Sequence, residues 1–108
     1  MKTIPITDLA KVIRSKNAGP YELTLDIIFK DQAGFEKTIK SGVINKTLIA
    51  NLYNISPDKV INIVEFPQAL AIKATIVRPR PSGALGETDV YGAQQHAPLL
   101  NIKVPICS

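Results

Sequence analysis

The sequence predicts a single α+β domain with an antiparallel-rich sheet and its helices on one face. Three observations predict this class. The length of 108 residues fits one domain, assigned here to residues 1–108. A composition that is 45% hydrophobic and 20% charged can fill a core without disulfides or a structural metal. Short β-rich segments are interspersed with short helical ones, as in layered α+β folds.

The first part of the chain predicts two extended segments around a polar loop. Residues 9–13 are a short apolar run, typical of a strand or a helical turn. Residues 14–20 are polar and end in glycine and proline, which predicts a loop. Residues 21–29 alternate apolar and polar side chains and are the clearest strand in the chain.

Two helices are predicted next. Asp31 is a suitable N-cap for a helix over about residues 32–41, which Gly42 interrupts. Asn45 is a suitable N-cap for a second helix that ends near Asn54. Both helices are short, and this favours a sheet covered on one side.

The C-terminal half predicts a hairpin, a long loop and a final strand. Residues 60–66 and 69–77 are β-rich and closely linked, as in antiparallel neighbours. Residues 78–89 hold two prolines and two glycines and are longer than a simple chain reversal needs. One helical turn at residues 93–96 and a strand over residues 99–106 complete the chain. This order of elements predicts a ferredoxin-like sandwich or a relative of it.

Charge and composition argue against several functions. The net charge is +4, but the basic residues are spread along the chain and aromatic residues are few, so nucleic-acid binding is not expected. No apolar stretch is long enough to cross a membrane. The only cysteine is Cys107, and the start of the chain has no secretory signal pattern, so we expect a reducing compartment, the cytoplasm.

The first polar segment is a candidate ligand site. It offers two cations, a hydroxyl and an amide, which suit a carboxylate or a phosphate. These side chains are Arg14, Ser15, Lys16 and Asn17. A solvated turn is the alternative interpretation. Glu22 and Asp26 share one face of the neighbouring predicted strand, about 13 Å apart at ~3.3 Å per residue, and are interpreted as a solvated or interface face.

The second candidate site lies between residues 78 and 96. Arg80 is an anion anchor beside two prolines, or alternatively a salt-bridge donor to a partner, and Ser82 follows it. His96 is suited to acid–base chemistry at neutral pH, with Gln94 and Gln95 to orient a substrate. A structural hydrogen bond is the alternative role for His96. A single histidine and a single cysteine predict no metal site.

Several strings in these segments resemble a known family. They are IRSKNAGPYELT at residues 13–24, ALAIK at 69–73, RPSG at 80–83 and DVYGAQQHAPLL at 89–100. They resemble a small bacterial family of unknown function whose members occur beside, or fused to, AtuA-type proteins of acyclic terpene utilisation. The order of elements is also similar, more faintly, to the C-terminal ferredoxin-fold domain of AtuA-type proteins.

The resemblance implies an accessory subunit of a larger AtuA-like chain, one that completes or stabilises a site for an anionic acyl-CoA or carboxylic acid substrate. It supplies no catalytic residues, and it leaves the cofactor unknown, including whether one enters with the partner. Two alternatives stay open: a purely structural oligomerisation module, including a homo-oligomer, and a small lyase or hydratase that acts alone. The last needs more reactive groups than one histidine and one terminal cysteine provide.

Overall fold

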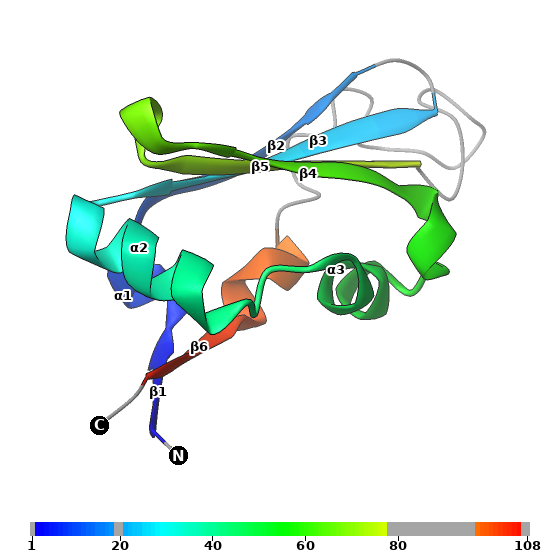
Figure 1. The fold of residues 1–108 in the computed structure, drawn as a ribbon. Helices are drawn as coiled ribbons and strands as arrows, with labels where there is room; N and C mark the ends of the chain where they lie inside the picture. Colours follow the sequence, from blue (N-terminus) through cyan, green and yellow to red (C-terminus); the bar gives the residue numbers. More distant parts are fainter. Residues whose placement is uncertain (1, 19–20, 78–96, 107–108) are drawn as a thin grey trace.

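The main sheet of the molecule has four antiparallel strands. The structure is a computed structural model and describes residues 2–18, 21–77 and 97–106. The strand order is β2-β3-β5-β4, with β2 (Ala10–Asn17), β3 (Glu22–Phe29), β4 (Val60–Phe66) and β5 (Ala71–Val77). Helices lie along one face of this sheet (Figure 1). The α+β class with antiparallel strands is confirmed, and the narrower ferredoxin-like arrangement stays a prediction.

The first hairpin is longer than the sequence predicts. The register of β2 with β3 extends from Ala10 to Asn17. The prediction of a loop over residues 14–20 is therefore wrong as far as Asn17. Pairing with β3 holds this polar segment extended, and alternation leaves Arg14 and Lys16 exposed. Charged side chains are common on an edge strand because they stay in water.

Helix α2 (Gln32–Ser41) has the bounds that the sequence predicts. The Asp31 carboxylate caps it by accepting a hydrogen bond from the Gly34 backbone N–H at 2.8 Å. Gly42 ends the helix with a φ of 68°, a left-handed conformation in which other residues are strained. The start and end signals are both local in sequence.

Helix α3 (Lys46–Tyr53) is the second predicted helix. The side-chain oxygen of Asn45 accepts a hydrogen bond from the Leu48 N–H at 2.9 Å and so caps the first turn. Asn54 ends the helix in the left-handed region, with a φ of 56°. A 3-10 turn, η1 (Pro57–Lys59), then leads into β4.

The second hairpin joins β4 to β5 through the 3-10 turn η2 (Pro67–Ala69). The two strands are antiparallel neighbours, as predicted. Leu70 closes the turn with a φ of 53°. The register shifts between Val60 and Asn62, so β4 has a β-bulge near its start. β5 also pairs with β3, and this pairing joins the two hairpins into one sheet.

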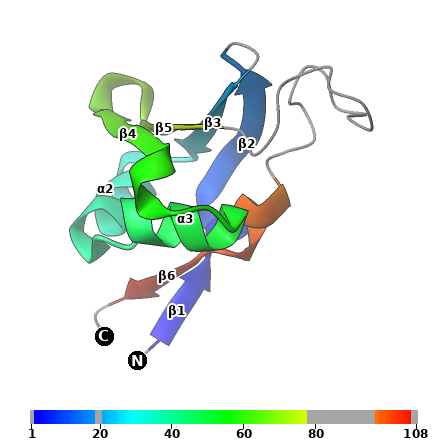
Figure 2. The ribbon, with the colours of Figure 1, turned by 90° about the vertical axis from the view of Figure 1, so that its right-hand side faces the viewer.

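The two ends of the chain form a second, two-stranded sheet. β1 (Lys2–Pro5) pairs antiparallel with β6 (Lys103–Ile106). Helix α1 (Ile6–Leu9) follows β1, and the 3-10 turn η3 (Ala97–Asn101) precedes β6. Figures 1 and 2 both show this ribbon on the far side of the helices from the main sheet. The sequence analysis did not predict β1.

The last strand is shorter than predicted. A strand over residues 99–106 is wrong in its first part, because η3 occupies the chain up to Asn101. Leu99 and Ile102 are 0% and 2% exposed, and the Ile6 N–H donates a hydrogen bond to the Ile102 carbonyl at 2.9 Å. The turn therefore buries apolar side chains that a straight strand would place on opposite faces.

The hydrophobic core lies between the main sheet and the helices. The inward-facing residues of β3 are at most 2% exposed, and they are Leu23, Leu25, Ile27 and Phe29. The Phe29 ring meets the ring of Phe35 from α2 edge to face, with centroids 5.8 Å apart. Ile49 of α3 is 1% exposed and belongs to the same cluster. The helix-facing side of β3 is thereby used for packing.

Candidate functional site

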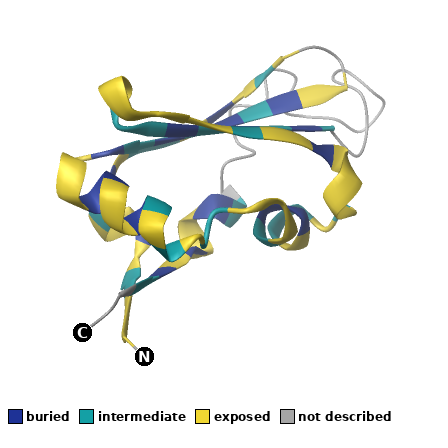
Figure 3. Cartoon of the chain, viewed as in Figure 1, coloured by how far each residue is buried: buried dark blue, intermediate teal, exposed yellow. Residues whose placement is uncertain are grey.

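The opposite side of the main sheet faces away from the helices. No described element covers it, and exposed residues extend along the β4–β5 hairpin (Figures 1 and 3). Strand alternation puts every second residue of each strand on this side. The register arranges these residues in three cross-strand rows of four. We call the three rows the outer face.

A charged row crosses the middle of the outer face. From β2 to β4 it consists of Arg14, Asp26, Lys73 and Val64. The Nε of Arg14 donates a hydrogen bond to Oδ2 of Asp26 at 3.1 Å. The two side chains are 62% and 19% exposed. The register places the Asp26 carboxylate between two cationic residues.

A polar row lies beside the charged one. It consists of Lys16, Thr24, Thr75 and Asn62. The Thr24 hydroxyl donates a hydrogen bond to the Lys16 carbonyl at 3.1 Å. This row adds a third cation and several hydrogen-bonding groups, which suit a polar or anionic ligand.

The third row is apolar. It consists of Val12, Ile28, Ala71 and Phe66. Phe66 is 44% exposed, and Val64, at the end of the charged row, is 39% exposed. The outer face thus combines cations on β2 and β5 with exposed apolar side chains at its β4 border, a mixture typical of protein interfaces.

The structure divides the first predicted ligand site between the two sides of the sheet. Arg14 and Lys16 lie on the outer face, whereas Ser15 is 7% exposed and faces the core side. Asn17 lies at the end of β2 and is partly buried. Successive side chains of a strand point to opposite faces, so Ser15 lies on the other side of the sheet from Arg14 and Lys16.

The second predicted site lies outside the described residues. This applies to Arg80, Ser82, Gln94, Gln95 and His96. The last described residue before them is Val77, which pairs with Glu22. At the same end of the sheet the Ala18 N–H donates a hydrogen bond to the Glu22 carbonyl at 3.0 Å. The end of β5 therefore lies beside the β2–β3 turn.

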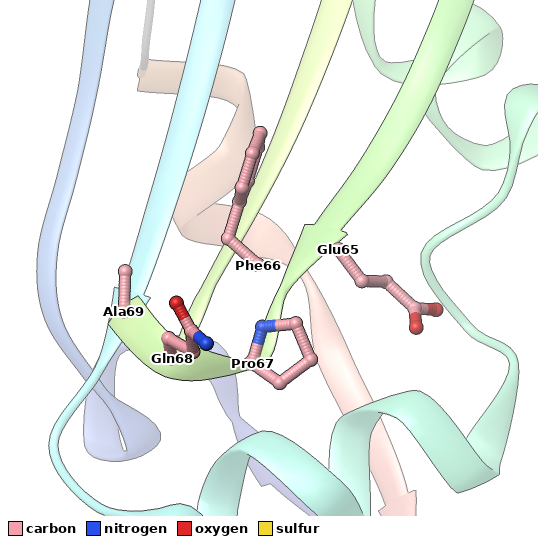
Figure 4. A pocket seen from close by; sticks show the side chains of 5 residues that line it. All are labelled: Glu65, Phe66, Pro67, Gln68 and Ala69. Carbon is pink, nitrogen blue, oxygen red and sulfur yellow. The ribbon is translucent and has the colours of Figure 1, made fainter.

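A shallow hollow of about 420 Å³ lies at the β4–β5 turn. It is lined by Glu65, Phe66, Pro67, Gln68 and Ala69, whose side chains diverge (Figure 4). A ligand site needs polar groups that converge on one point. This hollow offers none.

Among the residues that the structure describes, two ionisable groups have shifted pKa values, and both lie away from the outer face. Burial raises the pKa of Tyr53 on α3. A hydrogen bond from the Ser56 side chain lowers the pKa of Asp58 in η1. Strong shifts often mark catalytic groups, and here they lie beside the helices instead.

Comparison with known proteins places the chain in a family. A family described as "Domain of unknown function (DUF4387)" matches residues 6–103. The chain belongs to this family. No curated protein and no solved structure matches the chain. The DUF4387 description names no activity and no partner, so the predicted link to AtuA-type proteins stays a prediction.

The DUF4387 match covers the whole main sheet. It begins at Ile6, directly after β1, and ends at Lys103, the first residue of β6. The outer face therefore lies within the family domain. Among the residues that the structure describes, no three His, Cys, Asp or Glu side chains form a group that could hold a metal ion. None of the described helices is long and apolar enough to span a membrane.

The sequence analysis missed one pairing and one residue of the charged row. It placed Asp26 on a solvated or interface face and did not pair it with Arg14. Lys73 was not singled out, although a lysine inside the apolar stretch of residues 69–77 indicates a position that faces out of a sheet. Partners across strands need the register, which no single segment contains.

Proposed function

We propose that this chain is an accessory subunit that binds a larger protein through its outer face and there helps to hold an anionic substrate. The observation that carries the proposal is the charged row with its exposed apolar border, on a sheet side that no described element covers. Single exposed apolar residues are common, but two neighbouring ones on the same sheet face as a row of charged residues favour an interface.

The charges of the outer face favour an anion. Arg14, Lys16 and Lys73 supply three positive charges, and Asp26 supplies one negative charge. The ion pair uses Nε of Arg14. The terminal nitrogens of a guanidinium are the donors that bind a carboxylate or a phosphate through two parallel hydrogen bonds. A carboxylic acid or an acyl-CoA thioester carries such groups.

The sequence resemblance favours an AtuA-type chain as the larger protein. In this proposal Arg80 and Ser82 add to the anion site, Gln94 and Gln95 orient the substrate, and His96 transfers a proton. The last described residue before them, Val77, lies at the same end of the sheet as the β2–β3 turn.

The first test is assembly. Size-exclusion chromatography with light scattering is run on this chain, on the AtuA-type chain encoded nearest to it, and on their mixture. A stable mixed complex is expected. Lys16→Glu reverses a charge of the outer face and should weaken the complex, whereas Lys37→Glu makes the same change on α2 and should not. Absence of a mixed complex contradicts the proposal.

The second test asks whether this chain contributes residues to a substrate site or only stabilises the large chain. Arg14→Ala and His96→Ala should still bind the large chain while the complex loses turnover. A purely structural module predicts instead that variants lose activity only when they weaken assembly. Turnover that is unchanged in both variants rejects the site, and turnover by the isolated chain favours the independent lyase or hydratase.

A further inference from the structure

The three rows of the outer face contain one aromatic side chain, that of Phe66. It is 44% exposed, whereas Phe29 and Phe35 are 1% and 5% exposed and pack edge to face in the core. The shallow hollow of about 420 Å³ at the β4–β5 turn is lined in part by Phe66 (Figure 4). Stacking on a ring needs a free π-face and room for a second ring, but no convergent polar groups. Phe66 therefore offers a place for a flat ring such as a nucleobase.

A cation lies diagonally across from this aromatic ring. Phe66 is opposite Ala71, and Lys73 is two residues further along β5 on the same side of the sheet. Such diagonal neighbours are about 7–8 Å apart, which is within reach of aromatic and long side chains. Lys73 is partly exposed, and its ammonium forms no ion pair with another described residue. A phosphate attached to a ring that stacks on Phe66 can therefore meet this ammonium.

The cations of the outer face belong to two separate strands. Arg14 and Lys16 are on β2, Lys73 is on β5, and β3 lies between these strands. A spacing of ~4.8 Å between neighbouring strands puts β2 and β5 about 10 Å apart. A single carboxylate is already matched by one guanidinium through two parallel hydrogen bonds. A ligand with more than one phosphate spreads its negative charge and can contact the cations of both strands.

The acidic residue of the charged row suits a neutral donor. Oδ2 of Asp26 accepts a hydrogen bond from Nε of Arg14 at 3.1 Å, and a carboxylate can accept hydrogen bonds on both of its oxygens. The Asp26 side chain is 19% exposed, so a ligand can reach it. A carboxylate repels a phosphate but accepts a hydrogen bond from a ribose hydroxyl, as acidic residues do in dinucleotide sites. The outer face thus offers partners for a base, a sugar and phosphates.

We propose that the outer face binds a nucleoside diphosphate group. The base stacks on Phe66, a ribose hydroxyl donates a hydrogen bond to Asp26, and the phosphates contact the cations of β5 and β2. This inference rests on the proposed function, because it uses the same anion site. It also selects between the two proposed substrates, since acyl-CoA contains a nucleoside diphosphate and a simple carboxylic acid does not.

A single nucleotide fits this face better than a nucleic-acid strand. A protein that binds single strands stacks successive bases on several aromatic side chains. The outer face has one such side chain, Phe66, which is enough for one base. The small number of aromatic residues, which argues against nucleic-acid binding, is therefore compatible with one nucleotide group.

The first experiment compares ligands that contain different parts of this group. Isothermal titration calorimetry is run on the full chain with CoA, ADP, adenosine and acetate. CoA and ADP should bind. Adenosine lacks the phosphates and acetate lacks the nucleoside, so both should bind at least about tenfold more weakly. The affinity for CoA should fall as salt is added, because the cations are exposed.

The second experiment changes one contact at a time and uses circular dichroism to check that each variant folds. Lys73→Gln keeps the length of the side chain and removes its charge, so the Kd for CoA should rise about tenfold. Lys37→Gln makes the same change on α2 and should leave this Kd unchanged. Phe66→Leu keeps an apolar side chain without a ring. It should raise the Kd for CoA about tenfold and leave the binding of pyrophosphate unchanged.

Three outcomes would overturn the nucleotide assignment. The first is a chain that does not bind CoA at millimolar concentration. The second is equal affinity for CoA and pyrophosphate with no effect of Phe66→Leu, which leaves a simple anion site as the proposed function has it. The third is a single-stranded oligonucleotide that binds much more tightly than CoA. These titrations use the isolated chain, so absence of the mixed complex contradicts only the accessory-subunit proposal.

Discussion

The two sides of the main sheet differ in what covers them. Helices cover the core side, and no described element covers the outer face. On β3 the core-facing Leu25 is 1% exposed beneath the helices, while Asp26 next to it is 19% exposed. Among the described residues, Asp26 is shielded by its neighbours across the strands, such as Arg14. The core side therefore supplies stability through apolar area, and the outer face can carry charges without a large cost in stability.

The strongest test of this difference compares alanine substitutions at two neighbouring residues of β3, one on each side of the sheet. Leu25→Ala should lower the free energy of unfolding by about 2–5 kcal/mol, because it leaves a cavity in the core. Thr24→Ala should cost at most about 1.5 kcal/mol, the value of its one hydrogen bond. Urea denaturation of both variants measures the contrast. Equal losses would mean that the outer face is packed like the core.

The helices on the core side depend on their caps. Asp31→Ala removes the acceptor for the Gly34 N–H and should lower the free energy of unfolding by about 1 kcal/mol. Gln32→Ala, one residue later and exposed, is the control and should change it by less than about 0.5 kcal/mol. If urea denaturation gives the same midpoint for both variants, the cap does not stabilise α2.

The core side should also respond to alkaline pH through Tyr53. Burial raises the pKa of Tyr53 in the folded chain above the usual value of about 10. The contribution of Tyr53 to the free energy of unfolding is fully present below pH 10. It is lost as the pH rises further, because the unfolded chain then releases the phenol proton first. Stability should fall by up to about 1.4 kcal/mol per pH unit above pH 10.

Tyr53→Phe has no phenol to titrate and is the matched variant for this effect. Thermal melts between pH 8 and 11 should show a smaller alkaline loss for Tyr53→Phe than for the wild type. Parallel curves for the two chains would assign the alkaline loss to other groups.

The smallest effect is expected on the outer face itself. A double-mutant cycle of Arg14→Ala and Asp26→Ala should give a coupling energy of about 0.2–1 kcal/mol, because Arg14 is largely exposed. The coupling should shrink in high salt. A coupling of several kcal/mol that is insensitive to salt would show that the pair is covered in solution.

Elements with local signals were predicted well. Asp31 and Asn45 each accept the expected hydrogen bond, and α2 and α3 begin directly after them. The strand of residues 21–29 and the β4–β5 hairpin were also read correctly. A cap, a left-handed residue or an alternating pattern acts within a few residues, so one segment contains the information.

Elements that depend on distant partners were not predicted. β2 extends through Arg14 to Asn17 because β3 provides a hydrogen-bonding partner. η3 replaces the start of a strand because Leu99 packs into the core. The placement of the first candidate site also depends on this pairing, because alternation on β2 puts Ser15 on the opposite side of the sheet from Arg14 and Lys16.

The sequence alone determined the α+β class, the two capped helices, the second hairpin and the DUF4387 family. Only the tertiary structure decided that Asp26 lies between Arg14 and Lys73, and that β4 is an edge strand of the described sheet with exposed apolar side chains. The physical reason is that local propensity shapes each element separately. The alignment of strands arises only when the whole chain buries its core.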